Sequence, residues 1–139
     1  DLVMAIFGAP RRCADAPFQA ATCALAMVRA REELNRQATR PIAIGIGVAC
    51  GSVVAGCMGS VDRLNYTVLG ERVNLASRLC GKARAMEVII DQAMRDRLGT
   101  RIQVDELGGV ELKGMPAPVP AFRLRTVSAG AGAAEGQSI

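Results

Sequence analysis

The residues best suited to chemistry are a polar pair, Asn74 and Arg78, in the segment Asn65–Leu79. A helix that begins near Glu71 places positions four apart on one face. The apolar arc of that helix is separate and consists of Val73, Ala76, Leu79 and Cys80. The polar pair therefore points away from the core. A guanidinium fork and an amide together suit a sugar or phosphate oxygen, although spacing alone favours a solvated helix face.

The chain of 139 residues contains no His. This excludes Ser-His-Asp triads, Cys-His couples, a His general base and His-ligated zinc. Carboxylate, cysteine, Lys/Arg and hard-metal chemistry remain open. The net charge of +4 is mild, and one Tyr and three Phe give little aromatic surface for stacking bases. We therefore expect no nucleic-acid partner, whereas an anionic small ligand fits the basic balance.

The cysteines and the apolar runs indicate the compartment. Five cysteines occur without a CxxC pair, and an odd, irregularly spaced set is typical of reduced thiols in the cytoplasm. The longest apolar runs are far shorter than the roughly 20 residues of a membrane span, and no signal-peptide pattern is present. We therefore expect a cytoplasmic segment without membrane contact of its own.

Apolar periodicity and turn residues predict the elements that position the polar pair. In the first half we expect a strand at 2–7, a helix capped by Asp15 with Pro17 in its first turn that ends before Pro41, a strand at 42–49, its hairpin partner at 53–58 across Gly51-Ser52, and a strand at 64–69. In the second half we expect a helix from Gly70 to about Ala83, a strand at 88–90, a helix from the N-cap Asp91 to Leu98 ended by Gly99, a hairpin of 102–107 and 110–112 around Gly108-Gly109, and a last strand at Phe122 and Leu124.

The strand at 42–49 has one bulky face and one nearly bald face. Ile and Val alternate with Gly and Ala along it, and we expect the bald face to pack closely under a helix. Two hairpins among alternating helices and strands favour an α+β sandwich with helices on one face of a mainly antiparallel sheet. No GxGxxG or Walker lysine motif is present.

Four segments together resemble the class III adenylyl/guanylyl cyclase catalytic domain. In chain order they are DLVMAIFGAP at 1–10, IGIGVACGSVVAGCMG at 44–59, YTVLGERVNLASRL at 66–79 and ELKGMPAPV at 111–119. The resemblance covers residues 1–126, and the combination of motifs is highly specific. It implies a ferredoxin-like α/β sandwich of the nucleotide cyclase type. The Gly/Ala/Ser-rich residues 127–139 are expected to form a disordered tail.

The resemblance implies a role for each matching residue. Asn74 and Arg78 match the Asn and Arg of the VNxAxR helix, which orient the ribose and stabilise the transition state. Thr67, seven residues before Asn74, matches the base-selecting position, where Thr favours ATP over GTP. Lys113 matches the lysine of the LKG motif and is expected at the triphosphate. Asp1 matches the second of two metal-binding aspartates.

The implied activity is that of an adenylate cyclase in cyclic nucleotide signalling, with its active site at a dimer interface. The resemblance implies ATP as substrate, two Mg²⁺ or Mn²⁺ ions per site, and a homodimer or a heterodimer of cyclase domains. The missing His agrees with this activity. Attack of a ribose 3′ oxygen on the α-phosphorus needs in-line positioning and charge neutralisation more than a protein base.

Two alternatives remain open at this point. Guanylate cyclase is disfavoured by Thr67 alone, and a catalytically inactive cyclase-like domain is disfavoured by Asn74, Arg78 and Asp1 together. The family carries, upstream of the position of Asp1, a first metal-binding Asp, two helices and a purine-reading Lys. We therefore expect an N-terminally truncated domain that is nearly inactive alone. Other domains of the parent protein can anchor it to a membrane.

Overall fold

The main sheet is mixed but mostly antiparallel. The computed structural model describes residues 1–128, with the backbone alone for Tyr66 and Thr67. From residue 129 on, the tail expected at 127–139 lies outside the described residues. The strand order is β1 (Gly45–Val48), β4 (Glu87–Asp91), β6 (Val119–Val127) and β5 (Ile102–Val110). Strands β1 and β4 run parallel, whereas β4–β6 and β5–β6 are antiparallel. The expected α+β class with a mainly antiparallel sheet is confirmed.

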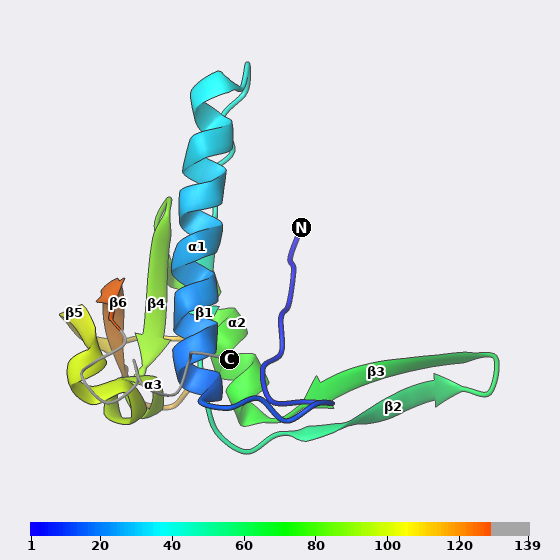
Figure 1. Ribbon diagram of the computed structural model, residues 1–139. Coiled ribbons are helices and arrows are strands. Elements are labelled where there is room, and N and C mark those ends of the chain that lie inside the picture. Colours follow the sequence, from blue (N-terminus) through cyan, green and yellow to red (C-terminus); the bar gives the residue numbers. More distant parts are fainter. Residues whose placement is uncertain (129–139) are drawn as a thin grey trace.

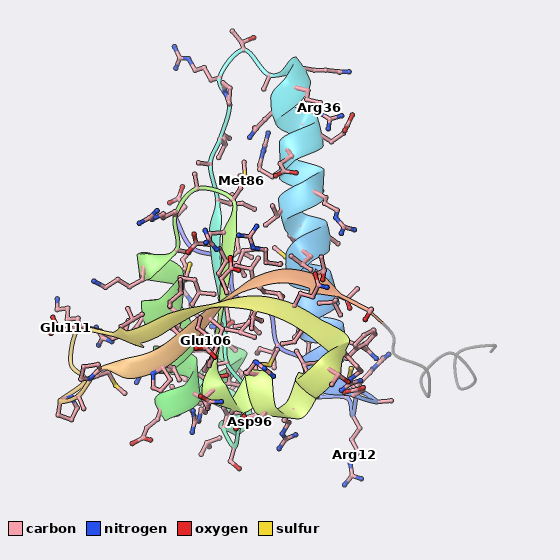
Figure 2. The ribbon with its side chains drawn as sticks, turned by 90° about the vertical axis from the view of Figure 1, so that its left-hand side faces the viewer. Arg12, Arg36, Met86, Asp96, Glu106 and Glu111 are labelled. Carbon is pink, nitrogen blue, oxygen red and sulfur yellow. The ribbon has the colours of Figure 1, made fainter. Side chains whose placement is uncertain are left out.

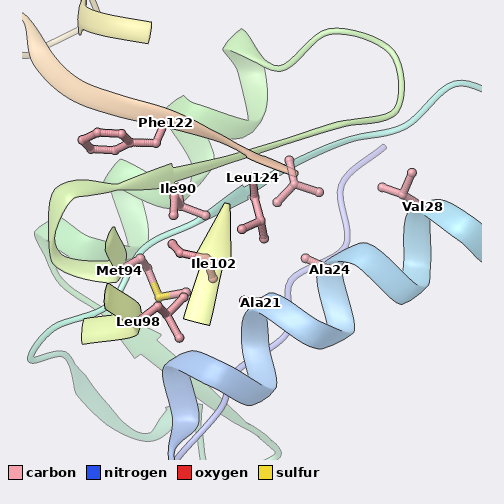
Figure 3. Close-up of a cluster of buried hydrophobic side chains, with 10 residues drawn as sticks. Ala21, Ala24, Val28, Ile90, Met94, Leu98, Ile102, Phe122 and Leu124 are labelled. Carbon is pink, nitrogen blue, oxygen red and sulfur yellow. The ribbon is translucent and has the colours of Figure 1, made fainter. Parts of the chain in front are cut away.

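Helices pack on both faces of this sheet (Figure 1). They are α1 (Ala16–Gln37), α2 (Glu71–Lys82) and α3 (Gln92–Leu98). Val88 and Ile90 of β4 belong to one cluster with α1 and α3, whereas Ile89 belongs to another with α2. Figure 3 shows the first cluster, with Ala21 and Ala24 of α1 facing the strands. The expectation of helices on one face is wrong, because β4 sends apolar side chains to both sides.

The bald face of β1 lies under α2, as its glycines predict. A Cβ atom built on Gly47 would lie 2.2 Å from the carbonyl oxygen of Ala76 and 2.3 Å from the backbone nitrogen of Cys80. The Cys80 thiol donates a hydrogen bond to the carbonyl oxygen of Gly45 at 3.3 Å. The helix backbone therefore rests directly on the strand, which only glycine permits.

A two-stranded arm projects away from the main sheet (Figure 1). Strands β2 (Val54–Ser60) and β3 (Arg63–Leu69) pair antiparallel across a two-residue turn at Val61-Asp62. The hairpin expected at Gly51-Ser52 is wrong, since β1 pairs with β4 and the chain leaves β1 without folding back on it. A two-residue loop keeps the strands it joins adjacent, so the tight turn at Val61 fixes β3 as the partner of β2.

The second expected hairpin, around Gly108-Gly109, is also wrong. Strand β5 passes through both glycines and pairs with β6 along its length. The register shifts between Glu106 and Gly108, and Gly108 adopts φ +71°. A Cβ on Gly109 would lie 2.8 Å from Cβ of Pro118. Glycine in a strand marks a bulge or a close approach of two chain segments as readily as a turn. Here Gly108 lies at a bulge and Gly109 lies close to Pro118.

The N-terminal segment differs from its prediction. Residues 2–7 form no strand, since no neighbour within residues 1–128 pairs with them, and an apolar pattern does not replace the missing backbone hydrogen bonds. Asp15 stands at the N-cap of α1, but its side chain makes no capping hydrogen bond. It pairs instead with Arg101 of the short helix η1 (Gly99–Arg101). Pro17 lies in the first turn as predicted.

Helix α3 follows its prediction closely. The Asp91 carboxylate accepts a hydrogen bond from the backbone N–H of Met94 at 2.8 Å and so caps α3, and Gly99 ends that helix. Figure 2 shows β5 and β6 crossing above α3, on which Asp96 lies. The same view shows Arg36 near the end of α1, where the helix projects beyond the sheet.

Candidate active site

The helix that carries Asn74 and Arg78 begins directly after the arm. Gly70 joins β3 to α2 with φ +143°, and its carbonyl oxygen accepts a hydrogen bond from the backbone N–H of Asn74 at 3.3 Å. Leu75 and Leu79 are the buried residues of α2. Asn74 is exposed and Arg78 is half-buried. The predicted helix is confirmed, and its geometry places the two polar groups one turn apart and off the buried stripe.

Arg78 lies against the turn that follows β5. A Cβ built on Gly114 would lie 3.3 Å from Nη2 of Arg78, and Gly114 adopts φ +80°. The turn is anchored by Leu112, which is buried in the cluster that includes Leu79. Lys113 stands between these two anchoring points and is exposed. The structure thus brings Arg78 and the Lys113 turn together, although they are far apart in sequence.

The guanidinium of Arg78 has N–H hydrogen-bond donors available for a ligand. Among the side chains described in residues 1–128, it forms neither an ion pair nor a hydrogen bond, while the ion pairs that are present involve Arg36, Arg72, Arg101, Arg123 and Arg125. A guanidinium fork with open donors matches the oxygens of a phosphate. Arg78 therefore offers open donors to an anionic group beside the Lys113 turn.

The other two predicted site residues lie on different elements. Thr67 is in β3, opposite Gly56 of β2, and so belongs to the arm. Asp1 is exposed in the N-terminal segment, and within the described residues no hydrogen bond or ion pair joins it to Asn74 or Arg78. The structure does not bring Asp1 together with the α2 residues.

The described residues do not gather a donor set for a divalent cation. No group of three or more His, Cys, Asp or Glu side chains that could hold a metal ion is present among them. Asp1 alone supplies at most two oxygens, whereas Mg²⁺ demands near-octahedral coordination. The chain's described residues therefore do not fit a two-metal centre by themselves.

An ion pair between Arg72 and Asp91 was missed by reasoning from the sequence. Nη1 of Arg72 lies 3.3 Å from Oδ2 of Asp91, whose side chain is 2% exposed. Burial raises the pKa of the Asp91 carboxyl, while the Met94 N–H and the Arg72 guanidinium oppose that rise. One signal was present, because a cation in the first turn of a helix is disfavoured by the helix dipole and so indicates a specific partner.

Two further features bear on the setting of the site. No helix in the described part of the chain is long and apolar enough to cross a membrane. The cysteines at positions 13, 23, 50, 57 and 80 all carry free thiols.

Comparison with known proteins matches nearly the whole described chain to one family. A model of the adenylate and guanylate cyclase catalytic domain matches residues 1–126. The uncharacterized protein Rv1319c of Mycobacterium tuberculosis is 45% identical over 85 residues, which are 61% of this chain and 15% of that relative. The uncharacterized protein Mb1352c of Mycobacterium bovis is 44% identical over 87 residues, with the same shares. The chain thus spans 15% of the length of these curated relatives.

Two solved structures have the same fold over most of this chain. The adenylyl cyclase CyaB from P. aeruginosa has a TM-score of 0.81 at 28% identity, covering 86% of this chain and 65% of its own. The guanylyl cyclase Cya2 has a TM-score of 0.82 at 31% identity, covering 91% of this chain and 66% of its own. These neighbours therefore include both nucleotide specificities, and this chain spans about two thirds of each.

Proposed function

The chain belongs to the adenylate and guanylate cyclase catalytic domain family, and we propose that it acts as an adenylate cyclase, forming 3′,5′-cyclic AMP and pyrophosphate from ATP in cyclic nucleotide signalling. The observation that carries this proposal is the contact of Arg78 with the Lys113 turn, one helical turn from Asn74. An amide, a guanidinium and an ammonium are groups that suit the ribose and phosphate oxygens of a nucleoside triphosphate.

In the proposed reaction the ribose 3′ oxygen attacks the α-phosphorus. The bond from that phosphorus to the bridging oxygen of pyrophosphate breaks, and the 3′ hydroxyl proton is released. Asn74 orients the ribose so that the attack is in line, and Arg78 stabilises the negative charge that builds on the phosphoryl oxygens. Lys113 holds the triphosphate. Each of these contributions is positional or electrostatic, so the reaction needs no imidazole.

Divalent cations are generally used in this family. We propose two Mg²⁺ or Mn²⁺ ions per site, with Asp1 as one ligand, since carboxylate oxygens are the ligands that such hard cations take. The described residues do not supply the remaining donors.

The nucleotide preference rests on one position. We propose that Thr67 selects adenine, because it stands seven residues before Asn74 at the base-selecting position of the resembling domains. Guanylate cyclase activity is the alternative, and the similarity to the guanylyl cyclase Cya2 favours it as much as the similarity to CyaB favours ATP. Product formation from each nucleotide distinguishes the two.

The arm suits a partner domain. Val54, Val61 and Leu64 on it are 65%, 94% and 61% exposed, and apolar side chains gathered on a projecting hairpin are typical of an interface. We propose that a second cyclase domain, identical or related, packs against the arm and completes the site. A cytoplasmic location, which the free thiols favour, belongs to the same proposal.

A catalytically inactive domain that binds nucleotide or a partner is the second candidate function. The observation that favours it is that the described residues gather no metal-binding group. The open donors of Arg78 serve nucleotide binding equally well without turnover. Binding of a nucleotide without product would support this candidate.

The test is a cyclase assay with ATP and GTP in the presence of Mn²⁺. It compares the 139 residues with the longest product of the same gene, because the chain spans only part of its relatives. We expect cyclic AMP from the longer form and little or none from the 139 residues alone. Asn74→Ala and Arg78→Ala should each lower kcat by about 100-fold.

The matched control is Arg84→Ala, which removes an exposed arginine just beyond the end of α2. It should leave kcat within about twofold of the parent. Unchanged rates in both Asn74→Ala and Arg78→Ala would contradict the assignment of these residues. Absence of product from either nucleotide in the longest form would contradict the enzymatic proposal itself.

A further inference from the structure

Arg72 occupies a position where a cation is ordinarily unfavourable. It lies in the first turn of α2, two residues before Asn74, where the positive end of the helix dipole repels a guanidinium. The helix has no side-chain cap at Gly70 that would hold its first turn in place. Besides the backbone hydrogen bond from Asn74 to Gly70, the side chains of the first turn, including the acidic Glu71, are left to stabilise the start of α2.

The contact that Arg72 makes is with a rigid anchor in the sheet. Its Nη1 lies 3.3 Å from Oδ2 of Asp91, at the end of β4. The other carboxylate oxygen of Asp91 accepts the backbone N–H of Met94 at 2.8 Å. Asp91 is the one buried charged residue within residues 1–128, and removal of its partner would leave that charge unpaired.

The aliphatic stem of Arg72 is held as well as its charge. A Cβ built on Gly51 would lie 2.8 Å from Cγ and 3.1 Å from Cδ of Arg72. The stem therefore crosses directly over the backbone that leaves β1. Arg72 thus connects the loop after β1, the first turn of α2 and the junction of β4 with α3.

We propose that Arg72 is a positioning residue, whose ion pair with Asp91 fixes the first turn of α2 and so aims the Asn74 amide at the ribose. This inference rests on the proposed cyclase function, since Arg72 acts through Asn74 and does not touch the substrate. The contacts also separate two parts of the side chain: the stem packs on Gly51, and the guanidinium sets the direction of the turn.

The test is a double-mutant cycle with Asn74, assayed in the longest product of the same gene, because the 139 residues alone are expected to form little product. Arg72→Met keeps an apolar stem over Gly51 and removes the charge, and Asp91→Asn keeps an oxygen that can accept the Met94 N–H. Each should lower kcat by about tenfold and change KM by less than about twofold. In an Asn74→Ala background the same substitutions should cause no further loss, because the group they position is gone.

Two variants complete the experiment. Arg72→Lys should recover part of the lost kcat, since an ammonium still reaches toward Asp91, and Lys82→Met, which removes an exposed cation from the far end of α2, should change nothing. Losses of equal size with and without Asn74 would overturn the inference. A raised KM with unchanged kcat in Arg72→Met would overturn it too, because it would indicate direct contact with the nucleotide.

Hydrogen exchange separates this inference from the cyclase proposal. If the protein forms no cyclic nucleotide, the cyclase proposal fails, but the backbone amides of Asn74 and Leu75 still report on the first turn of α2. Arg72→Met should speed exchange at these amides by about tenfold while leaving Leu79 unchanged. Equal exchange in the parent and the variant at all three amides would overturn the positioning role.

Discussion

At the scale of single residues, Asp91 shows how burial and hydrogen bonding oppose each other. Its side chain is 2% exposed, so desolvation disfavours the charged form, whereas the Met94 N–H and the Arg72 guanidinium favour it. Desolvation is the largest of these causes, and the pKa of Asp91 in the folded chain lies above its ordinary value of 3.8. A buried carboxylate of this kind makes stability depend on pH in a direction opposite to that of a surface ion pair.

The pH dependence of stability should reveal this residue. Between 3.8 and the raised pKa, the native state binds more protons at Asp91 than the unfolded state does. The free energy of unfolding therefore falls as pH rises through that window. Asp91→Asn removes the titration, so the stability of the parent minus that of the variant should be largest in acid and decline toward neutral pH. Urea unfolding between about pH 3 and pH 7 measures this difference.

The sign of the slope decides the outcome. If the stability of the parent minus that of Asp91→Asn grows as pH rises, the ion pair with Arg72 outweighs desolvation and the pKa of Asp91 is lowered. Asp105 supplies a contrasting control, because hydrogen bonds and charge interactions with Arg125 and Arg123 lower the pKa of its carboxyl. The stability of the parent relative to Asp105→Asn should fall as pH drops below 3.8.

Local residue patterns predicted some of the features that depend on residues close in sequence, although the expected side-chain cap at Asp15 does not form. The cap at Asp91 and the shared face of Asn74 and Arg78 follow from helix geometry alone. The pair of Arg72 with Asp91 joins residues 19 apart, and that of Arg101 with Asp15 joins residues 86 apart. No local rule identifies such partners, because the fold decides which side chains meet.

At the scale of elements, glycine was informative where it removed bulk and misleading where it resembled a turn. The bald face of β1 correctly predicted a close helix, since a strand with no side chains on one side must be covered by backbone. Gly51 and Gly108 suggested hairpins that do not exist, because strand pairing is set by distant chain: β1 takes β4 and β5 takes β6. Most strands were thus predictable from local pattern, apart from the one expected at 2–7, whereas the pairing of β1 and of β5 was not.

The contact of α2 with β1 can be tested with two glycine substitutions of opposite sign. Gly47→Ala would place Cβ at 2.2 Å from the Ala76 carbonyl oxygen, so α2 must shift. We expect a loss of about 2 kcal/mol or more in the free energy of unfolding. Gly81→Ala, inside α2 with nothing within 4 Å of its Cβ, should instead gain about 0.5 to 1 kcal/mol, because alanine favours the helix.

Urea unfolding of both variants provides the measurement, and each serves as the control for the other. A neutral Gly47→Ala would mean that α2 does not rest on the β1 backbone. Because Asn74 and Arg78 lie on the same helix, the Gly47→Ala shift should also lower cyclase activity, whereas Gly81→Ala should leave it unchanged.

At the scale of the whole molecule, the arm is the part of the described chain that is least explained by its own fold. Strands β2 and β3 pair with each other and with no strand of the main sheet, and Val61 at the turn is 94% exposed. An isolated hairpin is marginally stable in water. Its apolar side chains therefore need a surface that the rest of residues 1–128 does not provide, and a second cyclase domain is the surface we propose.

Leu64→Asp tests whether the arm forms this interface, with Leu34→Asp as the matched control. Both leucines are 61% exposed, but Leu64 is on the arm and Leu34 is near the end of α1, so any difference reflects location. If the arm packs on a partner, Leu64→Asp buries a charge at the interface and should weaken association by about 100-fold or more. Sedimentation over a range of protein concentrations should then show monomer for Leu64→Asp and the parent's association for Leu34→Asp. Equal association in both variants would place the interface elsewhere. Cyclase activity should fall together with association, because the proposed second domain completes the active site.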